Sequence, residues 1–305
     1  IGTTPIIRSA FRFEVYSIAR STLAAASHSR ANSNNATAGQ PQHTDSQMKF
    51  RAFSLIVIGS LAISPPTFAQ TVPLSGAAKW ADSAAREIDA ATDAGDLTRL
   101  RGTKTLLDRA LVAFPNDALL LHYKGYALHR EASLQEGLGH HAEVEPLLDE
   151  ARSVLDQSLA IRPMAETHAL LSSVLGRSIA FHPIKAMFLG PQSGSQMTSA
   201  VTLGPNNPRV WLLRGIGAMY TPSQFGGGVA VAEQDLKKAA ELFEGDHPAP
   251  PAPSWGKAEV YAWLGQIYQK ENKPADAVTA YNRALEIDPD MHWVRNVLLP
   301  SVKPH

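Results

Sequence analysis

Residues that could take part in chemistry are few and scattered along the chain. His140 and His141, followed by Glu143 and Glu145, carry side chains that bind metals. Adjacent histidines in a loop point in different directions, however, and no third ligand stands at helical spacing. The segment is therefore more typical of a solvated loop between helices, and the sequence predicts no metal site.

Asp246 and His247, with a serine such as Ser254, supply the side-chain types of a hydrolase triad. Nothing around them indicates an activated nucleophile, and the run from Pro248 to Pro253 is typical of a linker. The P-loop, H-E-x-x-H and G-x-S-x-G patterns are all missing from the sequence. No cysteine is available as a nucleophile, a thiolate ligand or a disulfide partner. We therefore expect neither enzymatic activity nor a cofactor.

A run of three glycines, Gly226 to Gly228, could form a backbone nest for an anion. After an aromatic residue, such a run more often lets two helices turn sharply. We favour the turn, with Phe225 packing beneath it.

The elements that would position these residues are most clearly seen near the C-terminus. Residues 258–290 have the pattern of two amphipathic helices joined by a tight turn at 271–274. Short side chains would allow the two helices to approach closely, and large aromatic ones would fill the space around that contact. Pro289 then ends the second helix. The residues that define this pattern are Tyr261, Leu264, Gly265, Tyr268, Ala277, Tyr281, Ala284 and Pro289.

This stretch resembles a tetratricopeptide repeat, with which it shares the 34-residue period and the signature positions. Similar endings close at three other prolines, Pro115, Pro163 and Pro205, and a first-helix pattern follows each at 119–130, 167–178 and 209–220. Further helices are predicted over 76–93 and 97–114. The resemblance thus covers four to five units from about residue 97, and 291–302, with Trp293, Val297 and Leu298, has the pattern of a capping helix. It implies an all-α fold, a short right-handed solenoid of helix-turn-helix repeats.

The closing prolines are 48, 42 and 84 residues apart, which exceeds whole multiples of 34. We expect the surplus in loops at 133–143, 181–196, 225–228 and 246–256. The segment 181–197, with His182, Lys185 and Met187, is either a functional loop or a satellite helix over the convex side.

The N-terminal part has the layout of an export signal. Met48 opens a positively charged segment, an apolar run follows from Phe53 to Ile63, and Thr67 and Ala69 stand at the small-residue positions before cleavage. The run is short for a transmembrane anchor. We therefore expect a signal peptide at 48–69, a non-native or disordered leader at 1–47, and one helical domain at 70–305. In a Gram-negative bacterium the product would be secreted to the periplasm.

Charge is balanced over the whole chain, with 28 basic and 28 acidic residues. Residues 70–305 hold 22 basic and 26 acidic residues, a net charge of about −4. This composition argues against a nucleic-acid partner, and we expect no stable membrane insertion after cleavage.

The repeat register of the resemblance also implies a concave binding face. It places mainly basic and polar residues there, with Glu259 as the one acid, and two histidines that could gain charge at mildly acid pH. A basic groove would attract a protein or peptide partner of acidic character. The implied groove residues are His122, Tyr126, His129, Arg130, Arg177, Arg209, Tyr220, Gln266, Gln269 and Lys270.

The function expected from the resemblance is a non-catalytic scaffold that binds a protein or peptide in this groove. The signal peptide, degenerate repeats and FGG turn also resemble periplasmic helper subunits of TRAP-type transporters. The alternative is therefore a ligand-binding or partner subunit of such a transport system, with a closed and mostly apolar pocket.

Processing provides a first test. We predict that the exported protein begins at Gln70, because Thr67 and Ala69 fit the cleavage rule. Intact-mass spectrometry of the exported product should give the mass of 70–305. A product that still contains Phe53–Ile63 would contradict the prediction.

Overall fold

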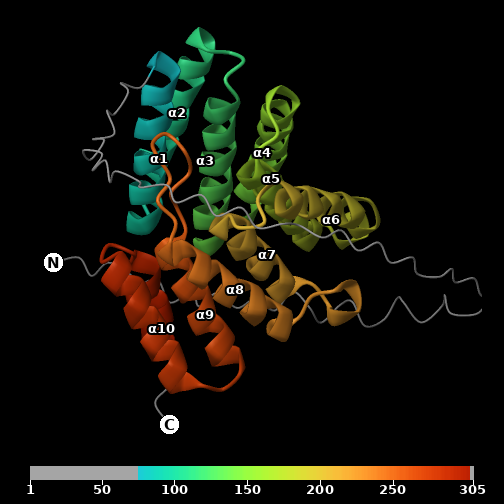
Figure 1. Ribbon diagram of the computed structural model, residues 1–305, viewed down its shortest axis with the longest axis vertical. Helices are drawn as coiled ribbons and strands as arrows, with labels where there is room; N and C mark the ends of the chain where they lie inside the picture. The colour runs from blue at the N-terminus through green and yellow to red at the C-terminus, as the bar shows by residue number, and fades with distance from the viewer. Residues whose placement is uncertain (1–74, 303–305) are drawn as a thin grey trace, which may run out of the picture. The chain divides into compact units, whose positions relative to one another are not determined.

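The computed structural model describes residues 75–302 (Figure 1). Within this range the chain forms eleven α-helices and no β-strand, which confirms the predicted all-α fold. The predicted leader, signal peptide and cleavage site lie outside the described residues. The long helices are α1 (Gly76–Ala94), α2 (Leu97–Ala113), α3 (Ala118–Gly137), α4 (His141–Ile161), α5 (Ala165–Phe181), α6 (Ala186–Leu203), α7 (Pro208–Tyr220), α8 (Val229–Glu244), α9 (Lys257–Lys270) and α10 (Pro274–Ile287).

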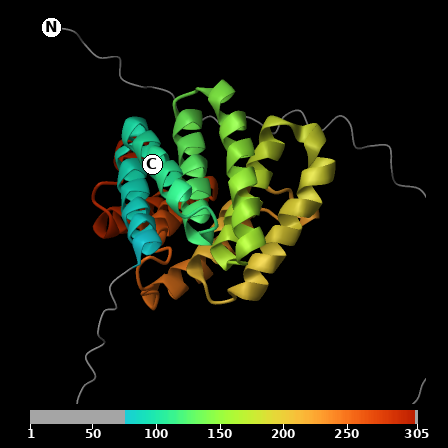
Figure 2. The same cartoon turned by 90° about the horizontal axis from the view of Figure 1, so that it is seen from above.

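The long helices of this part of the chain form helix-turn-helix pairs, from α1–α2 to α9–α10. The first helix of one pair also packs against the first helix of the next, as α1 does on α3 and α5 on α7. Figure 2 shows the helices of the early pairs side by side. This arrangement is the predicted helical-repeat solenoid, and α1, α3, α5 and α7 match the first helices expected from sequence. None of the described helices is long and apolar enough to cross a membrane.

Prolines and capping residues set the helix boundaries. Pro115 and Pro205 each stand two residues beyond the end of a second helix, as do Pro163 and Pro289. A side-chain acceptor then starts the next first helix after two of these prolines: Asp117 accepts the backbone N–H of Leu119 and Leu120 at 2.9 Å, and Asn207 caps α7. The chain therefore turns at the predicted places because proline ends one helix and a nearby Asp or Asn begins the following one.

Two of the predicted loops are wrong. Only residues 138–140 separate α3 from α4, so the surplus at 133–143 lengthens both helices. The segment 181–196 likewise forms a 3₁₀ turn, η1 (Pro183–Lys185), and the first half of α6. In both places glycine, histidine and proline suggested a loop. Burial decides otherwise, because Gln135 at the end of α3, Val144 at the start of α4 and Leu189 in α6 are all buried.

Glycine allows close contact within three of the pairs. A Cβ atom added at Gly125 would lie 2.5 Å from Leu155, and one at Gly215 would lie 2.8 Å from Leu236. At Gly265 the same atom would lie 2.3 Å from the ring of Tyr281, which is fully buried. The small residue predicted at the helix contact of the C-terminal repeat thus stands at that contact.

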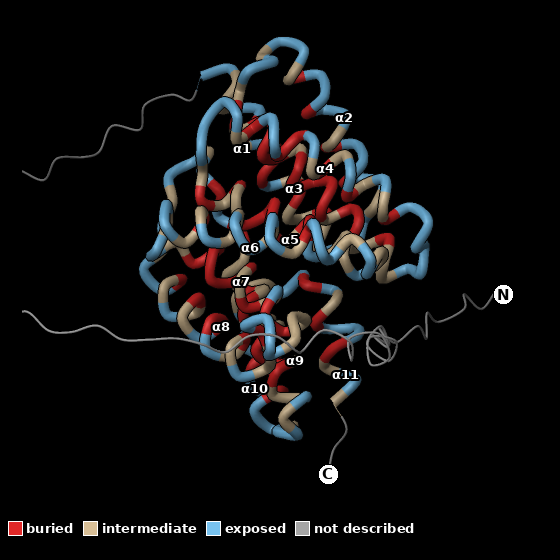
Figure 3. The backbone as a smooth tube through the Cα atoms, turned by 90° about the vertical axis from the view of Figure 1, so that its right-hand side faces the viewer, coloured by how far each residue is buried: buried red, intermediate tan, exposed pale blue. Residues whose placement is uncertain are grey.

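A short terminal element closes the last pair. It consists of a π-helical turn, η3 (Val294–Leu298), followed by α11 (Leu299–Ser301). Met291, Val294 and Leu298 pack with Tyr281 and alanines of α9 and α10. The predicted capping role is confirmed, although Val297 faces solvent. Figure 3 shows buried backbone where helices face one another and exposed backbone at the turns.

Close packing at Gly265 leads to a stability prediction. Gly265→Ala should lower the free energy of unfolding by about 1–3 kcal/mol, because the buried Tyr281 ring must move. Gly102 in α2 is the matched control, since nothing lies within 4 Å of its added Cβ. Gly102→Ala should instead raise stability by about 0.5–1 kcal/mol. Urea denaturation measures both, and equal effects would contradict the assigned contact.

Candidate functional site

The first helices of the pairs present one common side, which we call the inner face; its side chains include Tyr126, Arg130, Arg177, Tyr220 and Trp263. These residues come from α3, α5, α7 and α9.

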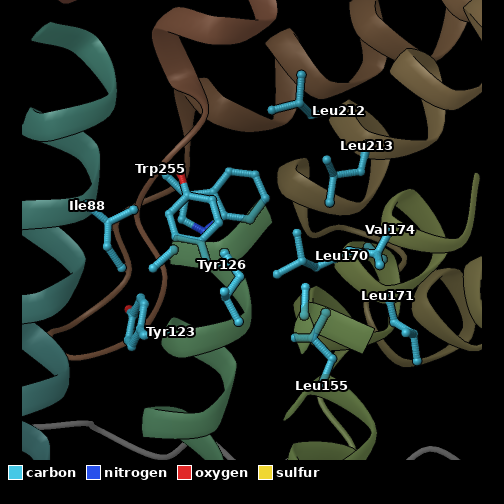
Figure 4. Close-up of a cluster of buried hydrophobic side chains, with 14 of the residues drawn as sticks. Ile88, Tyr123, Tyr126, Leu155, Leu170, Leu171, Val174, Leu212, Leu213 and Trp255 are labelled. Carbon is cyan, nitrogen blue, oxygen red and sulfur yellow. The ribbon is translucent and has the colours of Figure 1, made fainter. Parts of the chain in front are cut away.

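Part of the inner face is covered by the chain itself. Residues 245–256 between α8 and α9, which we call the strap, are non-helical as predicted, and Pro253 and Trp255 within it are buried. The Tyr123 hydroxyl donates to the carbonyl of Pro251 at 2.7 Å. Trp255 stacks on Tyr126, with ring centroids 5.0 Å apart and an interplanar angle of 17° (Figure 4). Only 4% of Trp255 is exposed. The end of the strap therefore joins the core beside α3 through Trp255.

An ion pair holds the start of the strap. Arg209 donates to both carboxylate oxygens of Asp246, at 3.3 and 2.6 Å, and is 2% exposed. Its guanidinium also lies 5.6 Å from the ring centroid of Phe243. Arg209 is thus buried and paired, and it cannot present a free positive charge to a partner. The same pairing occupies Asp246, which the triad hypothesis would need as a free acid.

A second ion pair joins α3 to α9. Arg130 donates to both carboxylate oxygens of Glu259, 129 residues further along, with a distance of 3.0 Å for Nη1–Oε1. The guanidinium lies 4.9 Å from the ring centroid of Tyr126 and 5.7 Å from that of Trp255. Burial raises the pKa of Glu259, but the Arg130 charge together with the hydrogen bonds from Arg130 and Trp263 outweighs this effect, and the net shift of the pKa is downward. Both groups are therefore held in their charged forms.

Arg177 is likewise satisfied within the protein. It donates to the backbone carbonyl of His129, to Ser133 Oγ at 2.9 Å and to Glu136 Oε2 at 2.7 Å. Burial lowers the pKa of Arg177, and Glu136 opposes that shift. With Arg130 and Arg209 also paired, the predicted basic groove is wrong: its three arginines are neutralised by acids that the sequence register did not place beside them.

The two histidines are buried and uncharged. His122 Nδ1 lies 2.9 Å from Thr167 Oγ1, and His129 Nε2 lies 3.1 Å from Ser173 Oγ. Burial lowers the pKa of His122 to about 4 and that of His129 well below its usual value. The expected gain of charge at mildly acid pH is therefore wrong as well, because neither ring has the solvent that its charged form requires.

The other part of the inner face is less deeply buried. Tyr220 of α7 meets Trp263 of α9 edge to face, with ring centroids 6.3 Å apart, and Trp263 meets Trp293 at 5.5 Å. All three rings are half-buried. Gln266 and Gln269 are also half-buried, and Lys270 is exposed. Of the three rings, the repeat register selected only Tyr220. The three rings are so far apart in the sequence that no helical period predicts the two tryptophans to lie beside Tyr220.

The remaining candidate chemistry has structural explanations. His140 Nδ1 lies 2.8 Å from Gln135 Oε1, while Glu145 pairs with His182 and Lys185. Across residues 75–302, no group of three or more His, Asp or Glu side chains could hold a metal ion.

The three glycines form a turn, as predicted. Gly226 and Gly228 have φ angles of 84° and 110°, and a Cβ at Gly227 would lie 2.1 Å from the carbonyl oxygen of Thr221. Phe225 does not pack beneath this turn as predicted, because 69% of it is exposed.

Two acids at the end of α1 lie close to this network. Asp89 accepts the Tyr126 hydroxyl at 3.0 Å, and burial raises its pKa to about 6 despite the nearby Arg130 charge. Burial and the neighbouring carboxyl of Asp288 also raise the pKa of Asp93. Sequence analysis singled out neither acid, since their partners come from distant parts of the chain.

Comparisons with known proteins agree with this architecture. The family model of the tetratricopeptide repeat matches residues 258–291. No curated protein sequence matches the chain. Three solved structures are similar to the chain. The HusA haemophore from Porphyromonas gingivalis is 23% identical, with 65% of this chain and 96% of that chain covered and a TM-score of 0.53.

A thermophilic TPR protein from Thermus thermophilus, TTC0263, is 21% identical over 72% of this chain and 95% of its own, with a TM-score of 0.49. YrrB, described as a TPR protein with an unusual peptide-binding site, is 15% identical over 64% and 81%, with a TM-score of 0.33. The likeness to HusA supports the fold alone. The chain thus contains a tetratricopeptide repeat at 258–291 within an all-α helical-repeat fold.

The pKa of Asp89 leads to a prediction about pH. In the folded protein the pKa of the Asp89 carboxyl is about 6, whereas the ordinary pKa of an aspartate is 3.8. The folded state therefore binds this proton more tightly than the unfolded chain does. The stability that the protonated carboxyl contributes is lost as pH rises from about 4 to about 6. Asp89→Asn keeps an acceptor for Tyr126 but cannot ionise. The variant should therefore be more stable than wild type by about 1–2 kcal/mol at pH 7.5, and the gain should vanish at pH 4.

Urea denaturation at the two pH values measures this difference. Asp290→Asn, a change at an exposed position, is the control and should have little effect at either pH. An Asp89→Asn effect of equal size at both pH values would show that ionisation of Asp89 does not matter.

Proposed function

We propose that the chain is an exported, non-catalytic scaffold that binds a protein partner on the inner face. The observation that carries this proposal is the division of that face. The strap and three internal ion pairs complete the part next to α3, whereas the part formed by α7, α9 and Trp293 leaves large aromatic side chains half-exposed. Tetratricopeptide folds commonly use this face for protein binding.

A non-catalytic role agrees with the state of the candidate residues. Of the triad considered in the sequence, Asp246 is held by Arg209, and His247 and Ser254 lie exposed on the strap. In a triad the acid holds the histidine and the histidine accepts the proton of the serine. Among the described residues no hydrogen bond joins these three side chains in that way, so the structure gives no support for the triad.

The structure argues against the acidic partner that the sequence predicted. An acidic peptide was expected from Arg130, Arg177 and Arg209, yet each has an acidic partner within the protein. The proposed partner is therefore a polypeptide without a required negative charge. Export to the periplasm stays part of the proposal and is supported by the signal pattern at 48–69.

The second candidate is a ligand-binding or partner subunit of a TRAP-type transport system. It would need a pocket that encloses a small molecule, typically of 300–1,000 Å³. Two depressions in the surface of the described residues could serve this role. One, between α1 and α2 beside Trp80 and Leu106, holds about 10 Å³; the other, about 580 Å³, is lined largely by polar residues such as Arg101, His140 and Glu143. Neither combines size with an apolar lining, so we prefer the scaffold.

Site-specific photocrosslinking tests the proposed function. A photoreactive phenylalanine analogue at Lys270, exposed on α9, should crosslink a polypeptide when the mature protein is incubated with periplasmic extract. The same analogue at Asn282, exposed on α10, is the matched control and should not. Mass spectrometry identifies the crosslinked species and any copurified small molecule.

Crosslinking at Asn282 alone would place the partner on the second helices and contradict the proposal. Copurification of a small molecule without a polypeptide crosslink would favour the transport alternative.

A further inference from the structure

Three aromatic rings form a continuous row on the inner face; we call Tyr220, Trp263 and Trp293 the aromatic row. Each comes from a different element: the end of α7, the middle of α9 and the residue before η3. Successive ring centroids lie 6.3 and 5.5 Å apart. The rings are half-buried, so the row combines a fixed position with accessible aromatic surface.

The groups beside the row are already paired. Trp263 donates its indole N–H to Glu259 at 3.3 Å, and Glu259 is bound by Arg130. Arg177, which lies near Tyr220, is paired with Glu136. A charged ligand would have to replace one of these partners, whereas an uncharged segment would not. The surroundings of the row therefore favour an uncharged, apolar occupant.

The strap shows which kind of segment fits this face. It contains four prolines in the run HPAPPAPSW, which ends at Trp255, and it is non-helical. It contacts α3 through a tyrosine hydroxyl that donates to a proline carbonyl, and through a ring stacked on Tyr126 (Figure 4). Proline suits such a surface because it lacks an N–H that would need an acceptor. The inner face thus already holds one proline-rich segment against aromatic side chains.

We propose that the aromatic row binds an extended, proline-rich segment of the protein partner. This inference rests on the proposed function and names the chemistry of the partner. A polyproline II segment rises about 3.1 Å per residue, so the spacing between neighbouring rings matches about two residues. Aromatic-lined surfaces are a general means of holding such segments, whose preformed shape lowers the entropy lost on binding.

Fluorescein-labelled decaproline is the probe that tests this proposal. Fluorescence anisotropy with the mature protein should show saturable binding of decaproline and none of a labelled Gly-Ser decamer. Trp263→Ala should weaken the binding at least about tenfold, in the range measured when an aromatic platform is lost. Trp80→Ala is the matched control: Trp80 is a half-exposed tryptophan of α1, outside the row, and its removal should leave the affinity unchanged. Binding should also be independent of salt, because no charge is involved.

Indole NMR signals give a readout that does not depend on whether the variants fold. Addition of decaproline to the wild-type protein should shift the indole N–H signals of Trp263 and Trp293 and leave those of Trp80 and Trp211 in place. Binding that survives Trp263→Ala in a folded variant, or shifts confined to Trp80 and Trp211, would overturn the proposal.

The crosslinking and decaproline experiments together test this inference separately from the proposed function. If Lys270 crosslinks a polypeptide but decaproline does not bind, the scaffold function stands and the proline-rich partner is wrong. If neither occurs, both proposals fail.

Discussion

The buried contact between α3 and α9 is the constraint on which the inner face depends. In an ordinary solenoid each repeat touches only its neighbours. Here Arg130 and Glu259 pair across 129 residues of sequence, with Tyr126 and Trp255 stacked beside them. Charges removed from water must be paired and hydrogen-bonded, otherwise their burial costs several kcal/mol each. The last helix pair is therefore linked to the second through the Arg130–Glu259 ion pair, and not only to the pair next to it.

This contact explains why most of the charges on the inner face are internal. The strap can follow α8 into the core only because Arg209 neutralises Asp246 at its start. Trp255 at its other end needs Tyr126 as a stacking partner. Arg177 of α5 is neutralised in the same way, by Glu136 of α3. The inner face is therefore neutral where the sequence predicted a basic surface. We expect shape and aromatic contacts, rather than charge, to decide which partner binds there.

Sequence alone predicts the parts of this fold that depend on local rules. Proline stops helices and Asp or Asn starts them within a few residues, so the boundaries near Pro115 and Pro205 could be placed in advance. Gly265 could be placed as well, because close helix contact within one repeat is set by residues about sixteen apart. The Arg130–Glu259 pair and the Trp255–Tyr126 stack could not. They join segments more than a hundred residues apart, and no period in the sequence relates them.

The same distinction explains the errors in the predicted site. A repeat register gives the direction of a side chain but not what lies opposite, and the neighbour decides whether an arginine is a ligand-binding group or a structural one. Asp246 stands in a proline-rich segment that looks like a linker, so nothing in the sequence pairs it with Arg209. The repeat register also fails to predict the aromatic row, because Trp293 stands just before the terminal element and outside the matched repeat. Because the row joins the last repeat to that element, its geometry depends on the same packing that fixes α9 against α3. A partner bound there would therefore meet a surface that is ordered before it arrives, and little binding energy would be spent on ordering it.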